Sequence, residues 1–128
     1  MIEAIGQIAN AVRHDIAPSV QSYQIRVRES TKGLSKDSAK RFKELVKLTK
    51  RDARGACTGW EAMAEAGVHP SLLFNRGLCA EQREDYDGAL ALYRQASQYG
   101  ANEGNEGASR ATRLIAGRED AKIRARRN

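Results

Sequence analysis

The two cysteines of this chain are the residues whose positions most directly suggest a chemistry. Cys57 and Cys79 lie equally far in sequence from residue 68, where we predict a turn between two antiparallel helices. Both side chains should therefore lie at the same height along that hairpin. A disulfide is sterically possible if both face inward, and it would indicate an oxidising compartment. The alternative is a pair of buried thiols, because free cysteine is among the most buried residue types.

The remaining reactive side chains do not form a recognisable active site or metal site. His14 and His69 are the only histidines, and neither has a second histidine or cysteine at metal-ligand spacing. The acidic residues within 81–87 lack the spacing of a calcium-binding loop. The glycines within 100–107 follow no predicted strand, which a phosphate-binding loop requires. We therefore expect no catalytic, cofactor-binding or metal-binding residues, and a protein that is not an enzyme.

The elements that must position these residues are expected to be mainly helical. The chain has 128 residues, few aromatics and two prolines, a composition typical of one mainly α domain. Residues 2–16 have helical apolar spacing, and alternating apolar residues predict a strand over 20–28. No second strand is evident, so we interpret residues 1–30 as a helix and strand from a missing upstream domain. The alternative is a short extended segment that lies across the helices.

The rest of the chain is predicted to be a helical domain. Residues 31–36 form a linker by their turn residues, and residues 37–128 follow as the domain. Helices are expected to start near residues 36, 52, 70, 85 and 108. The glycine- and asparagine-rich residues 101–107 predict a break before the last helix.

A pattern of small and large side chains runs through residues 70–99. Gly77, Ala89 and Ala96 are small, whereas Tyr86 and Tyr93 are large. Small residues let two helices approach closely, and aromatic side chains of the partner helix fill the holes between them. This hairpin resembles a tetratricopeptide repeat (TPR), the clear match in the chain.

A weaker copy of the pattern precedes it. Thirty-three residues before the second helix of that hairpin, Ala56, Trp60 and Met63 repeat the same order of side chains. Residues 37–67 are therefore interpreted as a first, degenerate hairpin, in which Glu44 replaces the small residue of its first helix. The last helix would be the cap that repeat arrays need. The resemblance covers about residues 37–100.

The resemblance implies a groove lined by the first helix of each hairpin, which binds peptides or protein surfaces in this family. The family's groove positions correspond here to Arg41, Leu45, Leu48, Phe74, Asn75, Leu78 and Glu81. Asn75 matches an asparagine of chaperone-binding members. Those members use a lysine and a second asparagine together with it to clamp the acidic C-terminus of a peptide. This chain has Arg41 and Leu45 at those two positions, which argues against binding of that kind. We expect an apolar groove that holds a partner helix, or the chain's own N-terminal helix or strand.

The order of helix, strand and repeat also resembles the C-terminal part of bacterial envelope lipoproteins. It favours a periplasmic or envelope location over the cytoplasm. The expected function is non-catalytic protein–protein interaction or scaffolding within a larger protein, with a protein or peptide partner and no cofactor. The N-terminal helix and strand are a possible interface for a homo-oligomer.

The charge distribution supplies an alternative function. The net charge is +6, and the basic residues concentrate in segments 32–54 and 110–127, which fit nucleic acid or an anionic surface. The absence of interleaved aromatics argues against nucleic acid, and basic residues also suit helix C-termini. No apolar run approaches the roughly 20 residues of a transmembrane helix. The first residues do not fit a signal peptide.

Overall fold

The computed structural model describes residues 26–127 of the chain. Within that range it contains five α-helices, one short 3₁₀ turn and no strand, which confirms the mainly α prediction. The elements are α3 (Lys36–Thr49), α4 (Ala53–Met63), η2 (Ala64–Ala66), α5 (Pro70–Gln82), α6 (Tyr86–Gln98) and α7 (Glu103–Arg127). This helical arrangement of residues 36–127 is compatible with a helical-repeat fold.

The helices begin at side-chain caps that the sequence supplies. Asp52 accepts a hydrogen bond from the Gly55 amide at 2.9 Å, and Asp85 accepts one from the Gly88 amide at 3.0 Å. Ser35 caps α3 in the same way. Such a cap satisfies one of the amides that the first turn leaves without an intrahelical partner. The helix starts were therefore predicted to within one or two residues for α3 to α6.

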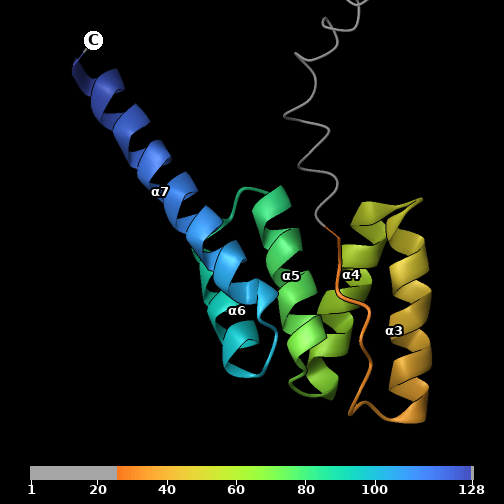
Figure 1. Ribbon diagram of the computed structural model, residues 1–128. Coiled ribbons are helices and arrows are strands. Elements are labelled where there is room, and N and C mark those ends of the chain that lie inside the picture. The colour runs from red at the N-terminus through yellow and green to blue at the C-terminus, as the bar shows by residue number, and fades with distance from the viewer. Residues whose placement is uncertain (1–25, 128) are drawn as a thin grey trace, which may run out of the picture.

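The helices form two consecutive hairpins followed by a single long helix. Figure 1 shows α3, α4, α5 and α6 as neighbours in a row, with α7 beside α6 and extending well beyond it. Asp52 and Asp85, the caps of α4 and α6, are 33 positions apart. Leu45, Leu78 and Ala111 continue this spacing on α3, α5 and α7, and all three are buried. Residues at this spacing are thus buried alike on α3, α5 and α7.

The core of the first hairpin is built on aromatic and leucine side chains. Phe42 of α3 lies against Trp60 of α4, with ring centroids 4.7 Å apart. Leu45 is fully buried and packs onto Gly59, where an added Cβ would come within 2.4 Å of the leucine side chain. The missing side chain at Gly59 therefore permits the close approach of α3 and α4.

The core of the second hairpin is centred on one tyrosine. The fully buried Tyr93 ring of α6 lies between Gly77 of α5 and Gly107 of α7, and a Cβ at either glycine would lie 2.7 Å from it. Small residues on two flanking helices therefore form the slot that this ring fills.

The predicted break over residues 101–107 is wrong, because α7 starts at Glu103. Gly100, with a φ of 110°, provides the reversal after α6, and only two residues separate it from the helix. The glycines at 104 and 107 lie within α7. A Cβ at Gly104 would come within 2.4 Å of the Tyr93 carbonyl oxygen, so these glycines allow close helix packing rather than interrupt the helix.

The N-terminal helix and strand are not supported. The described end of the predicted strand, residues 26–28, has no strand structure, and the chain stays without regular secondary structure as far as residue 30. It lies across the helices instead, as the alternative interpretation proposed. The expected helix over 2–16 and the remainder of residues 1–25 lie outside the described residues.

Candidate functional site

Residues 26–34, which we call the groove segment, lie against the central helix α5. Figure 1 shows the segment running between α3 and α5 before it turns into α3. Its backbone is held by the side-chain amide of Asn75, which accepts a hydrogen bond from the Arg28 amide at 2.7 Å and donates one to the Arg28 carbonyl at 3.1 Å. Asn75 is fully buried, so both polar ends of its amide are satisfied by a single residue of the segment.

The side chain of Arg28 is bound as well. Its Nε donates a hydrogen bond to Ser71 Oγ at 3.1 Å, and its guanidinium forms an ion pair with Glu103 of α7. Ser71 is fully buried, and only 18% of the Arg28 side chain is exposed. Hydrogen bonds to an ionised group in such a setting are stronger than neutral ones. Arg28 is therefore the most firmly held residue of the segment.

Both ends of the groove segment have further contacts with the helices. Val27 packs against the core of the second hairpin, and Leu34 packs against the core of the first. The Lys32 carbonyl lies 2.7 Å from Nε2 of His69, whose Nδ1 accepts a hydrogen bond from the Ser71 amide and caps α5. The segment consequently spans both hairpins.

A cavity adjoins the segment on the side of α7. Its volume is about 550 Å³, and its walls come from residues 26–30, from Phe74 of α5 and from Glu103, Glu106 and Arg110 of α7. One wall is therefore the groove segment itself.

The predicted groove residues do not all lie at the groove segment. Phe74 and Asn75 lie at the groove segment. Leu45 and Leu78 are buried in the cores of the two hairpins, and Leu48 packs against the first of them. Arg41 is half exposed and pairs with Glu44 on its own helix. The groove contacts are thus concentrated on α5.

Glu81, the last predicted groove residue, belongs to a cluster that fastens α7 to the second hairpin. Its carboxylate accepts hydrogen bonds from Arg110 at 2.7 and 2.8 Å and from the Tyr93 hydroxyl at 2.6 Å. The Arg110 guanidinium also lies 5.7 Å from the centre of the Tyr93 ring, a distance suited to a cation–π contact. The carboxylate is therefore engaged by α7 rather than free in the groove.

The cluster shifts the protonation equilibria of its members. Burial alone would raise the pKa of Glu81, but the hydrogen bonds from Arg110 and Tyr93 and the charge of Arg110 outweigh it, so the pKa lies below its ordinary value of 4.5. Burial and the neighbouring Glu81 carboxylate raise the pKa of Tyr93. The hydrogen bond to Glu81 raises the pKa of Arg110. At neutral pH the cluster is a carboxylate held by a guanidinium and a neutral phenol.

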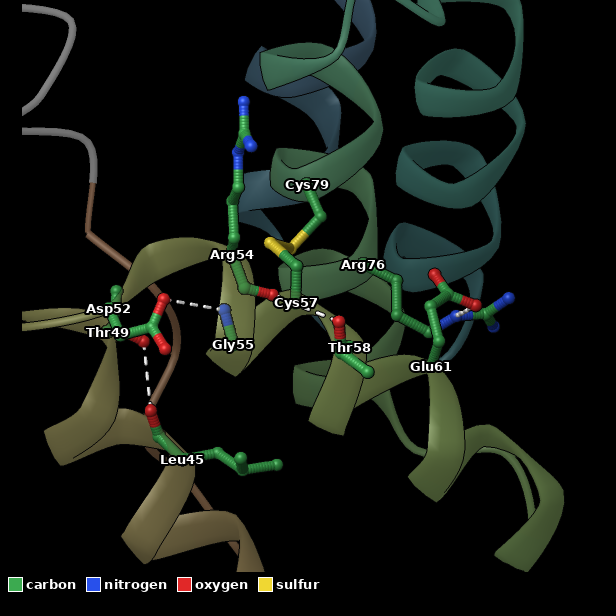
Figure 2. Close-up of a disulfide and its surroundings, with 10 residues drawn as sticks. All are labelled: Leu45, Thr49, Asp52, Arg54, Gly55, Cys57, Thr58, Glu61, Arg76 and Cys79. Carbon is green, nitrogen blue, oxygen red and sulfur yellow. Dashed lines mark hydrogen bonds and ion pairs between the residues drawn. A yellow bond between two sulfur atoms is a disulfide. The ribbon is translucent and has the colours of Figure 1, made fainter.

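Cys57 and Cys79 are joined by a disulfide in the structure. It links α4 to α5, with a Cα–Cα distance of 5.8 Å, and Figure 2 shows the sulfur–sulfur bond crossing between the two helices. An ion pair between Arg76 and Glu61, at 3.1 Å, joins the same two helices nearby. The bond therefore connects the first hairpin to the second.

The two basic segments lie far from each other. Residues 36–49 form α3 at one end of the row, and the basic end of α7 projects from the other (Figure 1). Within α7, Arg110 pairs with Glu81 and Arg118 pairs with Asp87. The two segments therefore do not combine into one basic surface.

Some site residues could not be found from the sequence. Ser71 was expected only as part of the start of a helix, and Glu103 fell in a predicted break. Their joint contact with Arg28 depends on the distance between α5 and α7, which no local pattern specifies. Of the predicted groove residues, only Phe74 and Asn75 indicated the contact with the groove segment.

Comparison of the chain with protein-family models, with curated proteins and with solved structures finds no match. Between residues 26 and 127, no group of three or more His, Cys, Asp or Glu side chains is arranged to hold a metal ion. In that same range, no helix combines the length and the hydropathy needed to span a bilayer.

Proposed function

We propose that this chain is a TPR-like, non-catalytic interaction module that binds an extended peptide along α5. The observation that carries the proposal is the paired hydrogen bonding of Asn75 to the amide and carbonyl of Arg28. A side-chain amide that pairs with both backbone groups of one residue recognises a chain in extended form, whatever side chains it carries. This favours an extended peptide over the partner helix that was the other expected occupant, because helical residues use these groups internally.

The TPR-like part of the proposal draws support from the repeat spacing. The caps of α4 and α6 and the buried residues of α3, α5 and α7 recur at 33 positions, a period close to the 34 residues of this repeat class. The glycine-and-tyrosine packing of the second hairpin agrees with the same resemblance. On this interpretation α7 is both the cap and a wall of the groove.

A peptide selection tests the proposal. Random peptides displayed on phage are selected on the full chain and counter-selected on the Asn75→Ala variant. Enriched peptides should bind the wild-type chain and should increase hydrogen exchange at residues 26–34, because they displace the groove segment. Asn105→Ala is the matched control, since Asn105 bonds Ser97 on the exposed surface and should leave binding unchanged. Peptides that bind the Asn75→Ala variant equally well, or no enrichment at all, would refute the proposal.

A further inference from the structure

The geometry points to an arginine-specific position in this groove: Ser71, Asn75 and Glu103 together select an extended peptide with arginine at the residue that Asn75 holds. This inference rests on the proposed function and names the chemistry of its partner. Residues 27–29 of the chain itself, Val-Arg-Glu, are the resident example of such a peptide.

The three groups divide the recognition of one residue between them. Asn75 holds its backbone, Ser71 accepts from its Nε, and Glu103 pairs with one of its terminal nitrogens. Ser71 and Asn75 lie four positions apart on α5 and therefore on one face of that helix, whereas Glu103 approaches from α7. The side chain between them must be long, cationic and able to donate from two different nitrogens.

Arginine meets this requirement, whereas lysine does not. A guanidinium presents its donors in a fixed planar fork, so Nε and a terminal nitrogen can serve Ser71 and Glu103 at once. A lysine ammonium is a single centre at the end of a flexible chain. It could reach Glu103 and leave the buried Ser71 hydroxyl without its donor. An unpaired buried polar group is costly, which provides discrimination beyond the attraction between charges.

The resident segment competes with any added peptide. It is tethered a few residues before α3, and a short tether produces a high local concentration. The substitution Arg28→Pro weakens this competition. It removes the backbone N–H that donates to Asn75, and it also removes the guanidinium. Because residue 28 lies outside the helices, this variant should keep its fold. Arg28→Ala is the milder form if the proline variant melts early.

The experiment measures the binding of three synthetic peptides to the full-length Arg28→Pro chain. The first has the sequence of residues 27–34 with a fluorescent label, and the other two carry Lys or Ala in place of its single arginine. We expect the alanine peptide to bind at least about tenfold more weakly than the arginine peptide, as loss of charge-assisted hydrogen bonds predicts. The lysine peptide should also bind several-fold more weakly. The wild-type chain, whose own segment competes, should bind the arginine peptide more weakly than the Arg28→Pro chain does.

A second pair of variants assigns the preference to Glu103. Adding Glu103→Gln to the Arg28→Pro chain should reduce the preference for arginine while the alanine peptide binds as before. Glu106→Gln, one turn along α7 and also on the cavity wall, removes the same charge and should leave the preference intact. Equal reduction by both variants would mean that the charge of the cavity, and not this position, attracts arginine, which overturns the inference.

The outcomes separate the two proposals. If all three peptides bind equally and Asn75→Ala abolishes their binding, arginine selection is overturned and the peptide-binding function stands. If the folded Arg28→Pro chain binds none of them, the peptide-binding function fails together with the inference.

Discussion

At the scale of single residues, the packing of Tyr93 between two glycines decides how closely α5, α6 and α7 approach. The small residue at Gly77 and the large one at Tyr93 could be paired from the sequence, because their spacing follows a known packing pattern. The contribution of Gly107 could not, since glycines in a polar run are usually taken for a break. Its role depends on a ring 14 positions away.

A pair of glycine substitutions tests this packing. Gly77→Ala places a Cβ 2.7 Å from the Tyr93 ring and should lower the free energy of unfolding by about 1–3 kcal/mol through overpacking. Gly117→Ala on α7 meets nothing within 4 Å, so its higher helix propensity should raise stability by up to about 1 kcal/mol. Urea denaturation of both variants measures the difference. Equal effects at the two positions would contradict the proposed packing.

The Glu81 carboxylate leads to a prediction about acid stability. A carboxyl group whose pKa is lowered in the folded state stabilises the protein above its unfolded pKa and loses that effect as the pH falls through the folded pKa. At pH 7, Glu81→Gln should therefore lower the free energy of unfolding by about 1.5–3 kcal/mol, the range for hydrogen bonds to charged groups. The difference in the free energy of unfolding between wild type and variant should become smaller as the pH falls below about 4.5.

Denaturant titrations of both proteins at several pH values between 7 and 3 measure that gap. Glu119→Gln, at an exposed position of α7, is the control and should change stability by no more than about 0.5 kcal/mol. A gap between wild type and Glu81→Gln that stays constant over the whole pH range would exclude a lowered carboxyl pKa.

At the scale of elements, the residues at which the helices of the two hairpins start were predictable. The packing of one hairpin against the other was not. Ser35, Asp52 and Asp85 signal the helix starts by local chemistry, since a capping side chain bonds within its own first turn. The pairing of Cys57 with Cys79 remained open, because bridging depends on the distance between α4 and α5. That distance is set by packing over the whole helices.

The disulfide makes the joint between the hairpins sensitive to reductant. Its cysteines are 22 positions apart, and closing a loop of this size typically stabilises a protein by about 3 kcal/mol. For a domain of this size, reduction should therefore lower the melting temperature by about 10 °C or more. Thermal melts with and without a phosphine reductant measure the shift. The double variant Cys57→Ala/Cys79→Ala should melt at the reduced temperature and respond to reductant no further; a wild-type melt that reductant leaves unmoved would argue against the bond.

At the scale of the whole molecule, α7 has two parts with different roles. Its first turns bury Gly104, Gly107 and Ala111 against the second hairpin, whereas residues 119–127 are exposed throughout. The sequence predicted a last helix in this part of the chain, which the structure contains. The sequence could not indicate the residue at which this helix stops packing against the second hairpin, since the helical pattern continues to the end of the helix.

Two truncations separate these parts. Deleting residues 119–128 should leave the melting temperature within a few degrees of the full chain, because those of its residues that the structure describes bury nothing. Deleting residues 103–128 uncovers Tyr93 and removes Arg110 from Glu81, and it should abolish the cooperative transition. Circular dichroism melts record both results. A cooperative melt of the shorter chain would mean that α7 is not needed as a cap.

The covalent link between α4 and α5 also determines how the chain carries tension. If the molecule is pulled from residue 26 and residue 127, the load bypasses the 22-residue stretch between the cysteines and passes through the sulfur–sulfur bond. At roughly 3.4 Å per extended residue, about 70 Å of contour length stays hidden until the bond is reduced. In a force–extension trace, reductant should lengthen the fully stretched chain by that amount, so the linkage would act as a length limiter.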